Sequence, residues 1–405
     1  MSKKLLLAAA LASASWGLAS WVPAALADDV KIGALMDVTG PIASFIPPLT
    51  NAVTLAIKHV NDQGGLLKGK AALAVGDTQG AAQTAVDAAS KLANVENAAI
   101  IMGALMSGTT ISAANAVTIP AGVVVISPTA TSPAITDLDD KDTVFRLVPS
   151  DNYQGEVLAR MVLAAGIKKV AVTFVNNDYG VGIGNTFMAA YKTAGGTITA
   201  SAKHEEKKNS YRSELATLAA SGAEALVVVA YAGDSGGVIV KQAIEGGLFA
   251  KFIGTDGLRD EALIKAVGAK ALETSFFSSP TSPADNAAQA TLHKLYNDAF
   301  KEGADKAFVD QVYDATFLAA LAVEQAGSAD RGKMGAALRA VTSGKGEVIL
   351  PGEWGKAKKL IGEKKAVTYV GAGGAYVFDA KGDVKGYIGK FVVDGDKYKQ
   401  VEILQ

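Results

Sequence analysis

The feature of this sequence that most constrains its fold is a regular alternation of short apolar runs with longer amphipathic stretches. Short apolar runs bounded by turn residues are typical of buried strands, and apolar positions three or four residues apart are typical of helices. Strands and helices that alternate in this way predict βαβ units, in which helices cover both faces of a parallel sheet. The first set of expected strands covers 30–36, 71–75, 99–102 and 123–126, and the expected helices between them cover 49–61, 79–95 and 110–117.

The alternation begins again after residue 151, which predicts a second lobe of the same α/β class. Each of the two sets is long enough to form a doubly wound parallel sheet with its own core. The expected strands of the second set cover 169–175, 197–202, 225–230 and 251–254, and its expected helices cover 153–165, 181–194, 210–221 and 235–246.

The rest of the chain is expected to pass between the two lobes again. A turn-rich segment at 278–283 allows a return to the first lobe, to which we assign helices over 286–302 and 309–326. A hairpin with strands over 375–378 and 384–393 is assigned to the second lobe. The expected division places 28–149 and 280–365 in the first lobe and 150–279 and 366–405 in the second.

The N-terminal segment has the pattern of a signal peptide. Lys3 and Lys4 precede the apolar run 5–12, and Ala25-Leu26-Ala27 forms a cleavage site, so we expect residues 1–27 to be removed after Ala27. No later stretch approaches the roughly 18 apolar residues of a membrane span, and no Cys is present to carry a lipid. The sequence therefore predicts an exported chain without a membrane anchor, located in the periplasm of a two-membrane cell.

Composition narrows the possible functions. The 405 residues include no Cys and three His, with 39 Lys and Arg against 40 Asp and Glu. Without a basic excess, binding to nucleic acid is not expected. Without Cys, thiolate nucleophiles and Cys-bound metal centres are excluded, and we expect neither a metal nor another cofactor.

One motif has the letters of a hydrolase site. Gly233-Asp234-Ser235-Gly236-Gly237 matches the nucleophile motif of trypsin-like serine proteases. Here it lies between an expected strand and an expected helix, and His59 and His204 lack the expected context. We therefore interpret the motif as a turn and do not expect an enzyme. A secreted serine hydrolase that uses Ser235 is kept as the alternative of another class.

Three further motifs are also incomplete. The phosphate-loop spacing at 64–70 is followed by Ala71 where a Ser or Thr is required. The glycines at 180–184 lack the third glycine of a dinucleotide fingerprint. The cluster at 204–206 is flanked by lysines, which indicates a solvated surface.

Two hydroxyl-rich loops follow neighbouring strands of the first set. Ser107 lies in the loop at 103–110, and Thr129 and Thr131 lie in the loop at 127–133. The carboxyl ends of neighbouring parallel strands meet at the edge where ligands bind in such sheets. Hydroxyls and free amides at a helix start can bind a carboxylate without a formal positive charge, although helix capping is the alternative role.

The second set supplies an aromatic residue and an acid at corresponding places. Tyr179 follows the strand 169–175, and Asp256 follows the strand 251–254. A carboxylate that faces the two hydroxyl loops is suited to an ammonium group, and Tyr179 can cover the hydrocarbon of a ligand. A solvated turn and a surface tyrosine are the alternative interpretations.

A set of motifs in a fixed order runs through most of the chain after residue 27. The motifs are Ile32-Gly33, Thr39-Gly40-Pro41, Ile57 with Asn61-Asp62-Gln63-Gly64-Gly65, Ile126-Ser127-Pro128-Thr129-Ala130-Thr131, Asn177-Asp178-Tyr179-Gly180, Tyr313-Asp314-Ala315 and Phe378-Asp379-Ala380-Lys381-Gly382-Asp383. Their order and spacing resemble the periplasmic branched-chain amino-acid binding proteins, the leucine/isoleucine/valine type of ABC-transporter substrate-binding protein. The resemblance implies a type I periplasmic binding protein, in which two lobes joined by three crossovers close on one small ligand. It also implies a monomer whose closed form is recognised by an inner-membrane permease.

The resemblance also implies roles for individual residues. Ser107 and Thr131 would bind the α-carboxylate and ammonium of an amino acid, assisted by backbone groups of Thr129 or Ala130. Asp256 takes the place of an acid that holds the ammonium. The remaining residues would contact the rest of the ligand: Tyr179 and Tyr231 from the second lobe, and Phe45, Leu105, Met106 and Phe308 around the side-chain pocket.

Departures from the family pattern bear on the ligand. The segment 44–48 lacks the usual glycine after the aromatic residue, and Met106 lies near one position of a disulfide found in some members. An insertion at 351–365 carries Trp354, to which the sequence assigns no role. The expected ligand is a small, aliphatic amino acid, with an aromatic acid, a short amide or urea as alternatives, and ligand sensing as an alternative to transport. Asp256 favours a ligand with an ammonium group.

Overall fold

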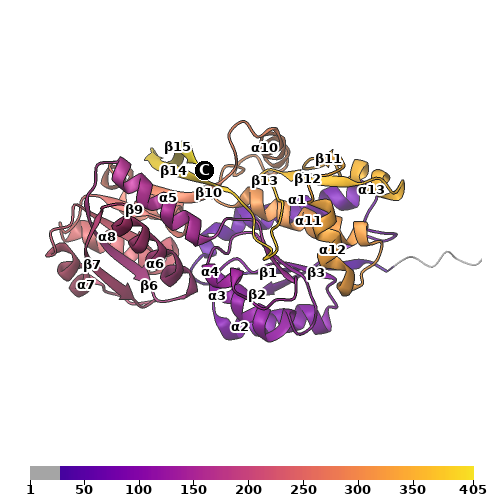
Figure 1. Ribbon diagram of the computed structural model, residues 1–405, viewed down its shortest axis with the longest axis horizontal. Helices are drawn as coiled ribbons and strands as arrows, with labels where there is room; N and C mark the ends of the chain where they lie inside the picture. The colour runs from indigo at the N-terminus through magenta and orange to yellow at the C-terminus, as the bar shows by residue number, and fades with distance from the viewer. Residues whose placement is uncertain (1–27) are drawn as a thin grey trace, which may run out of the picture.

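Two twisted sheets, each with helices on both faces, form two lobes that lie side by side along the long axis of the molecule (Figure 1). This computed structural model describes residues 28–405, and the expected signal peptide lies outside the described residues. Within them, no helix combines the length and the apolar character that crossing a bilayer requires.

The sheet of the first lobe is parallel throughout and has the order β2-β1-β3-β4-β5. Its central strands are buried on both faces, which explains why their sequences are continuous apolar runs. The strands are β1 (Val30–Met36), β2 (Ala71–Asp77), β3 (Ile100–Gly103), β4 (Val125–Ser127) and β5 (Val144–Arg146). The helices between them are α1 (Ile46–Asp62), α2 (Ala82–Ser90), α3 (Ser107–Ala113) and α4 (Pro133–Thr136).

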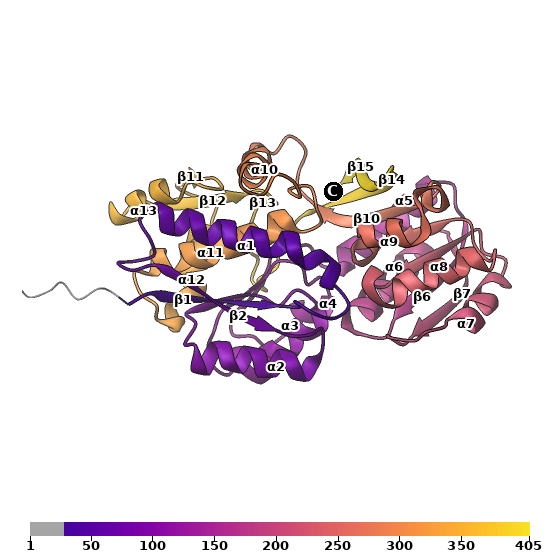
Figure 2. The same cartoon turned by 180° about the vertical axis from the view of Figure 1, so that it is seen from behind.

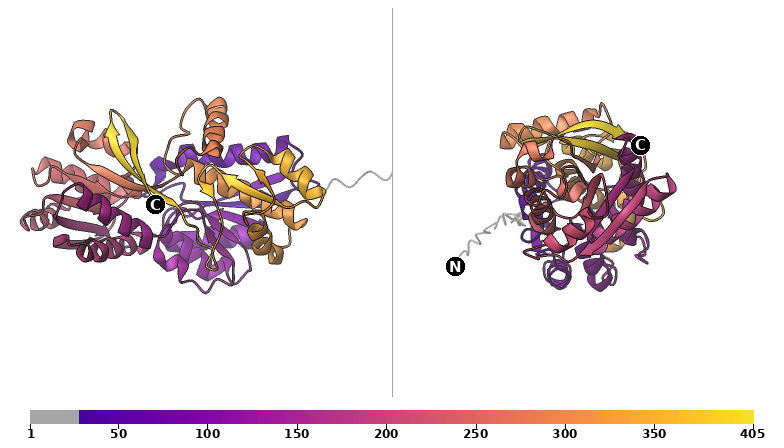
Figure 3. Two further views of the ribbon diagram at one scale, coloured as in Figure 1. Left: turned by 45° about the horizontal axis from the view of Figure 1, so that its top comes forward. Right: turned by 90° about the vertical axis from the view of Figure 1, so that its left-hand side faces the viewer.

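The sheet of the second lobe has the order β15-β14-β10-β9-β8-β6-β7. Its strands from β6 to β10 are parallel, and β14 and β15 add an antiparallel hairpin at one edge (Figure 3). The strands are β6 (Lys169–Val175), β7 (Thr197–His204), β8 (Ala225–Val229), β9 (Phe252–Gly254), β10 (Phe276–Thr281), β14 (Tyr387–Asp394) and β15 (Lys397–Leu404). The helices are α5 (Asp151–Ala164), α6 (Asp178–Thr193), α7 (Arg212–Ala219), α8 (Gly237–Glu245) and α9 (Glu261–Val267).

The segment after β10 returns to the first lobe. Helix α11 is buried from Val309 to Val323 and lies beside α1 (Figure 2). A small third sheet of order β11-β12-β13 lies at the same end of the molecule. These elements are α10 (Ala287–Phe300), α11 (Val309–Ala326), α12 (Met334–Val341), α13 (Trp354–Gly362), β11 (Glu347–Ile349), β12 (Val367–Gly371) and β13 (Gly374–Ala375).

Within residues 28–405, the chain passes between the two large sheets three times: between β5 and β6, after β10, and before β14. The third passage lies later than the expected 365/366, because β12 pairs with β11 and Asp383 binds Arg146 of β5. Of the expected hairpin, the strand over 384–393 corresponds to β14 of the second lobe, but its hairpin partner is β15 and not the segment 375–378. The segment expected as a turn at 278–283 is largely strand β10, which is buried between β9 and β14.

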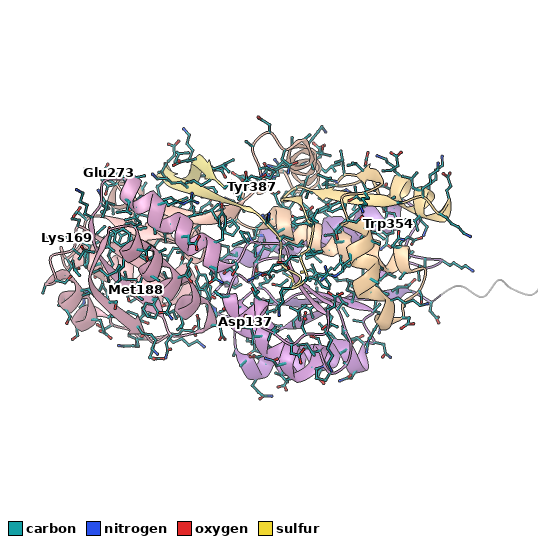
Figure 4. All side chains as sticks on the ribbon, viewed as in Figure 1. Asp137, Lys169, Met188, Glu273, Trp354 and Tyr387 are labelled. Atoms are coloured by element: carbon teal, nitrogen blue, oxygen red, sulfur yellow. The ribbon has the colours of Figure 1, made fainter. Side chains whose placement is uncertain are left out.

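The insertion that carries Trp354 packs against the first lobe, at the end of that lobe far from the second (Figure 4). Trp354 is fully buried, and its Nε1 donates a hydrogen bond to the carbonyl of Gly65, 3.0 Å away. Its ring meets Phe317 of α11 edge-on, with 5.7 Å between centroids. The insertion therefore connects α11 to the turn that follows α1.

Candidate functional site

A cavity lies between the lobes, at the carboxyl ends of strands from both sheets. It contains about 420 Å³ of space, its open mouth included. Ile42, Leu49 and Gly257 also line it, together with all but one of the residues expected from the sequence. The expected residues that line it are Phe45, Leu105, Met106, Ser107, Thr129, Thr131, Tyr179, Tyr231, Asp256 and Phe308.

Ala130 is the expected residue that does not line the cavity. Its side chain is buried with Ile135 and Val144, on the sheet side of the loop. Its amide donates a hydrogen bond to Oγ of Ser127 over 3.2 Å. This amide is therefore engaged within the loop and does not make the ligand contact expected of it. The direction of a loop residue follows from the local backbone conformation of the loop, which the sequence alone does not fix.

A buried aspartate positions the loop that contains Ser107. Asp37 Oδ2 accepts hydrogen bonds from the amides of Leu105 (3.0 Å) and Met106 (3.3 Å). Its Oδ1 accepts from the hydroxyls of Thr109, at 3.1 Å, and Thr78. Burial raises the pKa of Asp37, and these hydrogen bonds partly offset the effect. The amides of Leu105 and Met106 are therefore committed to Asp37, and Ser107 presents a hydroxyl at the cavity.

The second hydroxyl loop is tied to the first. Ser127 Oγ donates to the carbonyl of Ala104 over 2.6 Å, and the hydroxyl of Thr129 donates to the carbonyl of Leu105. Ser107 Oγ accepts from the amide of Ser132 over 3.2 Å. These contacts fix the two loops as one rigid wall. The side chain of Thr129 lines the cavity, but its hydroxyl is engaged in the hydrogen bond to Leu105.

The second lobe contributes an aromatic wall. The rings of Tyr179 and Tyr231 stack, with 5.1 Å between centroids and 24° between planes. The hydroxyl of Tyr179 lies 2.6 Å from Oγ1 of Thr255, accepts from the amide of Gly257 over 3.2 Å, and donates to Oδ1 of Asp256 over 3.1 Å. Burial and the nearby Asp256 hold the pKa of Tyr179 well above its usual range.

Asp256 is the acid that the sequence places in the cavity. Its side chain is buried, and Oδ1 also accepts from Nε2 of Gln154 over 2.8 Å. Burial raises the pKa of Asp256 to about 6, and the hydrogen bonds from Gln154 and Tyr179 partly offset this. Asp256 forms no ion pair among residues 28–405, but the charge of the nearby Arg259, whose Nε is itself buried, lowers the pKa of Asp256.

A second buried carboxylate, Asp151, was not expected from the sequence. It begins α5, and its amide donates to the carbonyl of Thr131 over 2.8 Å. Burial, and next the charge of Asp256, hold the pKa of Asp151 well above its usual range. An acid in the first turn of a helix normally interacts with the helix dipole. Only the packing of the second lobe against the first shows that this one is buried beside Asp256.

The two lobes contact each other at several points. Ser44 of the first lobe donates to Asp260 of the second, and Lys306 of the first lobe forms an ion pair with Glu261 of the second. Ser132 Oγ of the first lobe donates to the carbonyl of Asp178 of the second over 3.0 Å. The structure is therefore a closed arrangement, in which most residues that line the cavity are buried.

Ser235 and His204 do meet in the structure. Nε2 of His204 lies 3.1 Å from Oγ of Ser235, and Nδ1 lies 2.7 Å from the hydroxyl of Thr173. Both side chains are at most 2% exposed, and burial lowers the pKa of His204 to about 4. A hydroxyl at Nδ1 does not stabilise an imidazolium as a carboxylate does. The pair holds the turn after Tyr231 against β6 and β7.

Comparison with known proteins agrees with this architecture. The sequence profile of the family described as "Periplasmic binding protein" matches residues 29–373. The "Leu/Ile/Val-binding protein homolog 1" of Brucella melitensis is 30% identical over 395 residues, which cover 96% of this chain and 95% of the relative.

Two solved structures share the fold. The branched-chain amino-acid transporter substrate-binding protein LivJ from Streptococcus pneumoniae, in complex with isoleucine, has a TM-score of 0.78 at 22% identity, over 93% of this chain and 99% of that chain. A solute-binding protein from R. palustris, in complex with benzoate, has a TM-score of 0.76 at 19% identity, over 93% of this chain and 96% of that chain. With two sheets of this order, three passages between them and a closed cavity at their carboxyl edges, the chain belongs to the periplasmic binding protein family.

Proposed function

We propose that this protein binds a small aliphatic amino acid between its lobes in the periplasm and delivers it to an ABC permease of the inner membrane. The observation that carries this proposal is that the cavity is lined by polar groups from both lobes and by a set of apolar side chains. The polar groups are the carboxylate of Asp256 from the second lobe and the hydroxyl residues Ser107 and Thr131 from the first. The apolar residues are Phe45, Leu105, Met106 and Phe308 together with Ile42 and Leu49.

This combination of polar and apolar groups matches the chemistry of an amino acid. Asp256 accepts hydrogen bonds from the α-ammonium, and a charge-assisted bond of this kind is stronger than a neutral one. The hydroxyls of Ser107 and Thr131 donate to the α-carboxylate. The apolar residues contact the side chain, and the burial of each methylene there contributes about 0.8 kcal/mol.

Closure of the lobes is the proposed step that signals occupancy. The hydroxyl loops belong to the first lobe, and Tyr179, Tyr231 and Asp256 belong to the second, so one ligand contacts both. A ligand that makes both sets of contacts only when the lobes are closed shifts the population towards the closed form. The permease then recognises a surface that exists only in that form.

The names of similar proteins support an aliphatic side chain. The Brucella relative is named for leucine, isoleucine and valine, and the Streptococcus structure holds isoleucine. The benzoate complex supports an aromatic acid as the second candidate. Benzoate carries no ammonium, so its carboxylate would face Asp256 without the cation that an amino acid supplies. A short amide, urea and a sensing role are the remaining alternatives.

The proposal is tested by calorimetry on residues 28–405 after unfolding, dialysis and refolding, which removes ligand carried from the cell. The panel contains the common L-amino acids, benzoate, short amides and urea. We expect saturable binding of leucine, isoleucine or valine at one site per chain. Binding of benzoate alone, or of none of these amino acids, would overturn the proposal.

A pull-down with detergent-solubilised inner membrane separates transport from sensing. Capture of an ABC permease by the ligand-loaded protein supports transport. Capture of a receptor without a permease contradicts it.

A further inference from the structure

Two glycines of the second lobe lie so close to the first lobe that neither position has room for a side chain. A Cβ atom at Gly182 of α6 would lie 2.7 Å from Cδ of Pro133, the first residue of α4. A Cβ atom at Gly233, in the turn after β8, would lie 2.6 Å from the carbonyl oxygen of Pro41. Both distances are shorter than side chains in proteins tolerate, and both cross from one lobe to the other, where α4 packs against α6 (Figure 1).

The second lobe by itself does not require glycine at either position. Neither Gly182 nor Gly233 has a positive φ, so the backbone conformation is open to other residues. The three atoms nearest to a Cβ at each position all belong to the first lobe. They are Cδ and Cγ of Pro133 with Oγ of Ser132 at Gly182, and the carbonyl oxygen and carbon of Pro41 with Oγ of Ser44 at Gly233. The space is therefore restricted only when the lobes are closed.

The atoms that a Cβ would meet cannot move aside by rotation of a side chain. Cδ of Pro133 belongs to a ring that is closed on the backbone, and the carbonyl oxygen of Pro41 is itself backbone. Gly108 of α3 shows the opposite case, because a Cβ there would lie 3.1 Å from Oδ2 of Asp178, the end of an exposed and flexible side chain. At Gly182 and Gly233, fixed atoms of one lobe meet fixed atoms of the other.

Both glycines are directly connected to the wall that the second lobe contributes to the cavity. Gly182 lies three residues after Tyr179 in the same helix, and Gly233 lies two residues after Tyr231. The rings of these tyrosines stack and line the cavity. On the first lobe, Pro133 lies two residues after Thr131, which also lines the cavity. A group that separated α6 from α4 would therefore separate the two walls between which the ligand binds.

We propose that Gly182 and Gly233 are positioning residues for ligand binding, whose missing side chains allow the lobes to close fully. A methyl group at either position would hold the lobes partly open. The inference rests on the proposed function, in which the ligand contacts both lobes only in the closed form. It also gives a role to the first glycine of the motif at 233–237.

The test compares refolded protein, residues 28–405, with its Gly182→Ala and Gly233→Ala variants. We expect the dissociation constant for L-leucine to rise at least about tenfold in each variant, since an added methyl group in a tight contact is costly. Stopped-flow kinetics should show faster dissociation with little change in association, because the open form is unaltered. Small-angle scattering should show leucine-bound variants that are less compact than the leucine-bound parent. Gly362→Ala is the control, because a Cβ at this exposed position of α13 would meet no atom within 4 Å.

Two further measurements distinguish hindered closure from a damaged lobe. Alanine is a better helix former than glycine, so the urea midpoint of ligand-free Gly182→Ala should be at least as high as that of the parent, although leucine binds more weakly. Pro133→Ala removes the ring carbons that the new methyl group would meet. We expect the double variant to bind leucine within about threefold of Pro133→Ala alone. An equal loss with and without Pro133 would overturn the steric role of Gly182.

The outcomes separate this inference from the proposed function. If both glycine variants bind leucine as tightly as the parent does, the role of the glycines is wrong and the proposed function stands. If the parent binds benzoate and no amino acid, the proposed function is wrong, and the same comparison made with benzoate decides the role of the glycines. If one glycine variant does not fold, the other gives the answer, because its contact involves different residues of the first lobe.

Discussion

Tyr179 donates a hydrogen bond to Asp256 across 3.1 Å while its ring stacks on Tyr231, so one side chain supports both the polar and the aromatic parts of the second-lobe wall. The two bonded residues follow different strands, β6 and β9, which lie on either side of β8 in the sheet. The bond therefore ties two loops that the ligand must draw towards the first lobe.

The first prediction concerns Asp256. Asp256→Asn removes the acceptor charge that faces the ligand ammonium, and we expect it to weaken leucine binding by about 2–5 kcal/mol. Calorimetry on the refolded protein measures this loss. Asp298→Asn is the matched control, since it removes an exposed carboxylate far from the cavity. An affinity equal to that of the parent would remove Asp256 from the site.

The second prediction separates the hydroxyl of Tyr179 from its ring. Tyr179→Phe keeps the stacking on Tyr231 and loses the hydrogen bonds to Asp256 and Thr255, for an expected loss of about 0.5–1.5 kcal/mol in binding. Tyr179→Ala also removes the ring and impairs closure. Small-angle scattering with and without leucine measures closure. If Tyr179→Ala compacts on ligand addition as the parent does, the ring has no part in closure.

The sequence predicts those elements that are determined by their own residues, and it misses those that are determined by contacts with distant segments. The bounds of β6 and α11 agree with those expected, because long periodic segments carry their own signal. Strand β10 contains Ser278, Ser279 and Pro280, a composition typical of a turn, and becomes a strand through pairing on both sides. The composition of this segment gives no indication that it pairs with β9 and β14.

The same distinction applies to the cavity. The residues that line it follow predicted strands or carry family motifs, so their gathering was predictable. The burial of Asp151, the contact between His204 and Ser235, and the direction of Ala130 depend on how distant segments pack. The only feature of the sequence that could have indicated a role for Asp151 is its position where the chain first passes from one lobe to the other.

The third prediction concerns the contacts that hold the lobes together beside the cavity. Ser44 precedes Phe45, and Lys306 lies two residues before Phe308, while their partners Asp260 and Glu261 begin α9. These contacts join the two lobes, so they stabilise the closed form without touching the ligand. We expect Ser44→Ala to weaken leucine binding by about 1 kcal/mol and to speed dissociation.

Lys306→Met should have a smaller effect that disappears at high salt, because its ion pair with Glu261 is partly exposed. The control is Lys294→Met, whose partner Asp298 lies on the same helix. Stopped-flow dissociation of leucine measures the rates. Equal rates for the parent and Ser44→Ala at any ionic strength would show that these contacts do not act on closure.

The fourth prediction concerns the stability of the first lobe against pH. Asp314 of α11 is fully buried, and its carboxylate accepts hydrogen bonds from the hydroxyls of Tyr369 and Tyr376 and from the amides of Ala372 and Gly373. Burial raises the pKa of Asp314 to about 7, from an ordinary value of 3.8, despite these bonds. The folded protein therefore holds a proton on Asp314 more tightly than the unfolded chain does.

The sign of the pH effect follows from this difference. The contribution of Asp314 to the free energy of unfolding is complete below about pH 4 and is lost as the pH rises through 7. Asp314→Asn cannot titrate, so urea unfolding of the ligand-free variant between pH 5 and 7 should show a less negative slope with pH, by up to about 1.4 kcal/mol per pH unit. Asp298→Asn serves as the control, because the carboxylate it removes is exposed. A slope in Asp314→Asn equal to that of the parent would mean that Asp314 is ionised throughout this range, with its four donors outweighing the cost of burial.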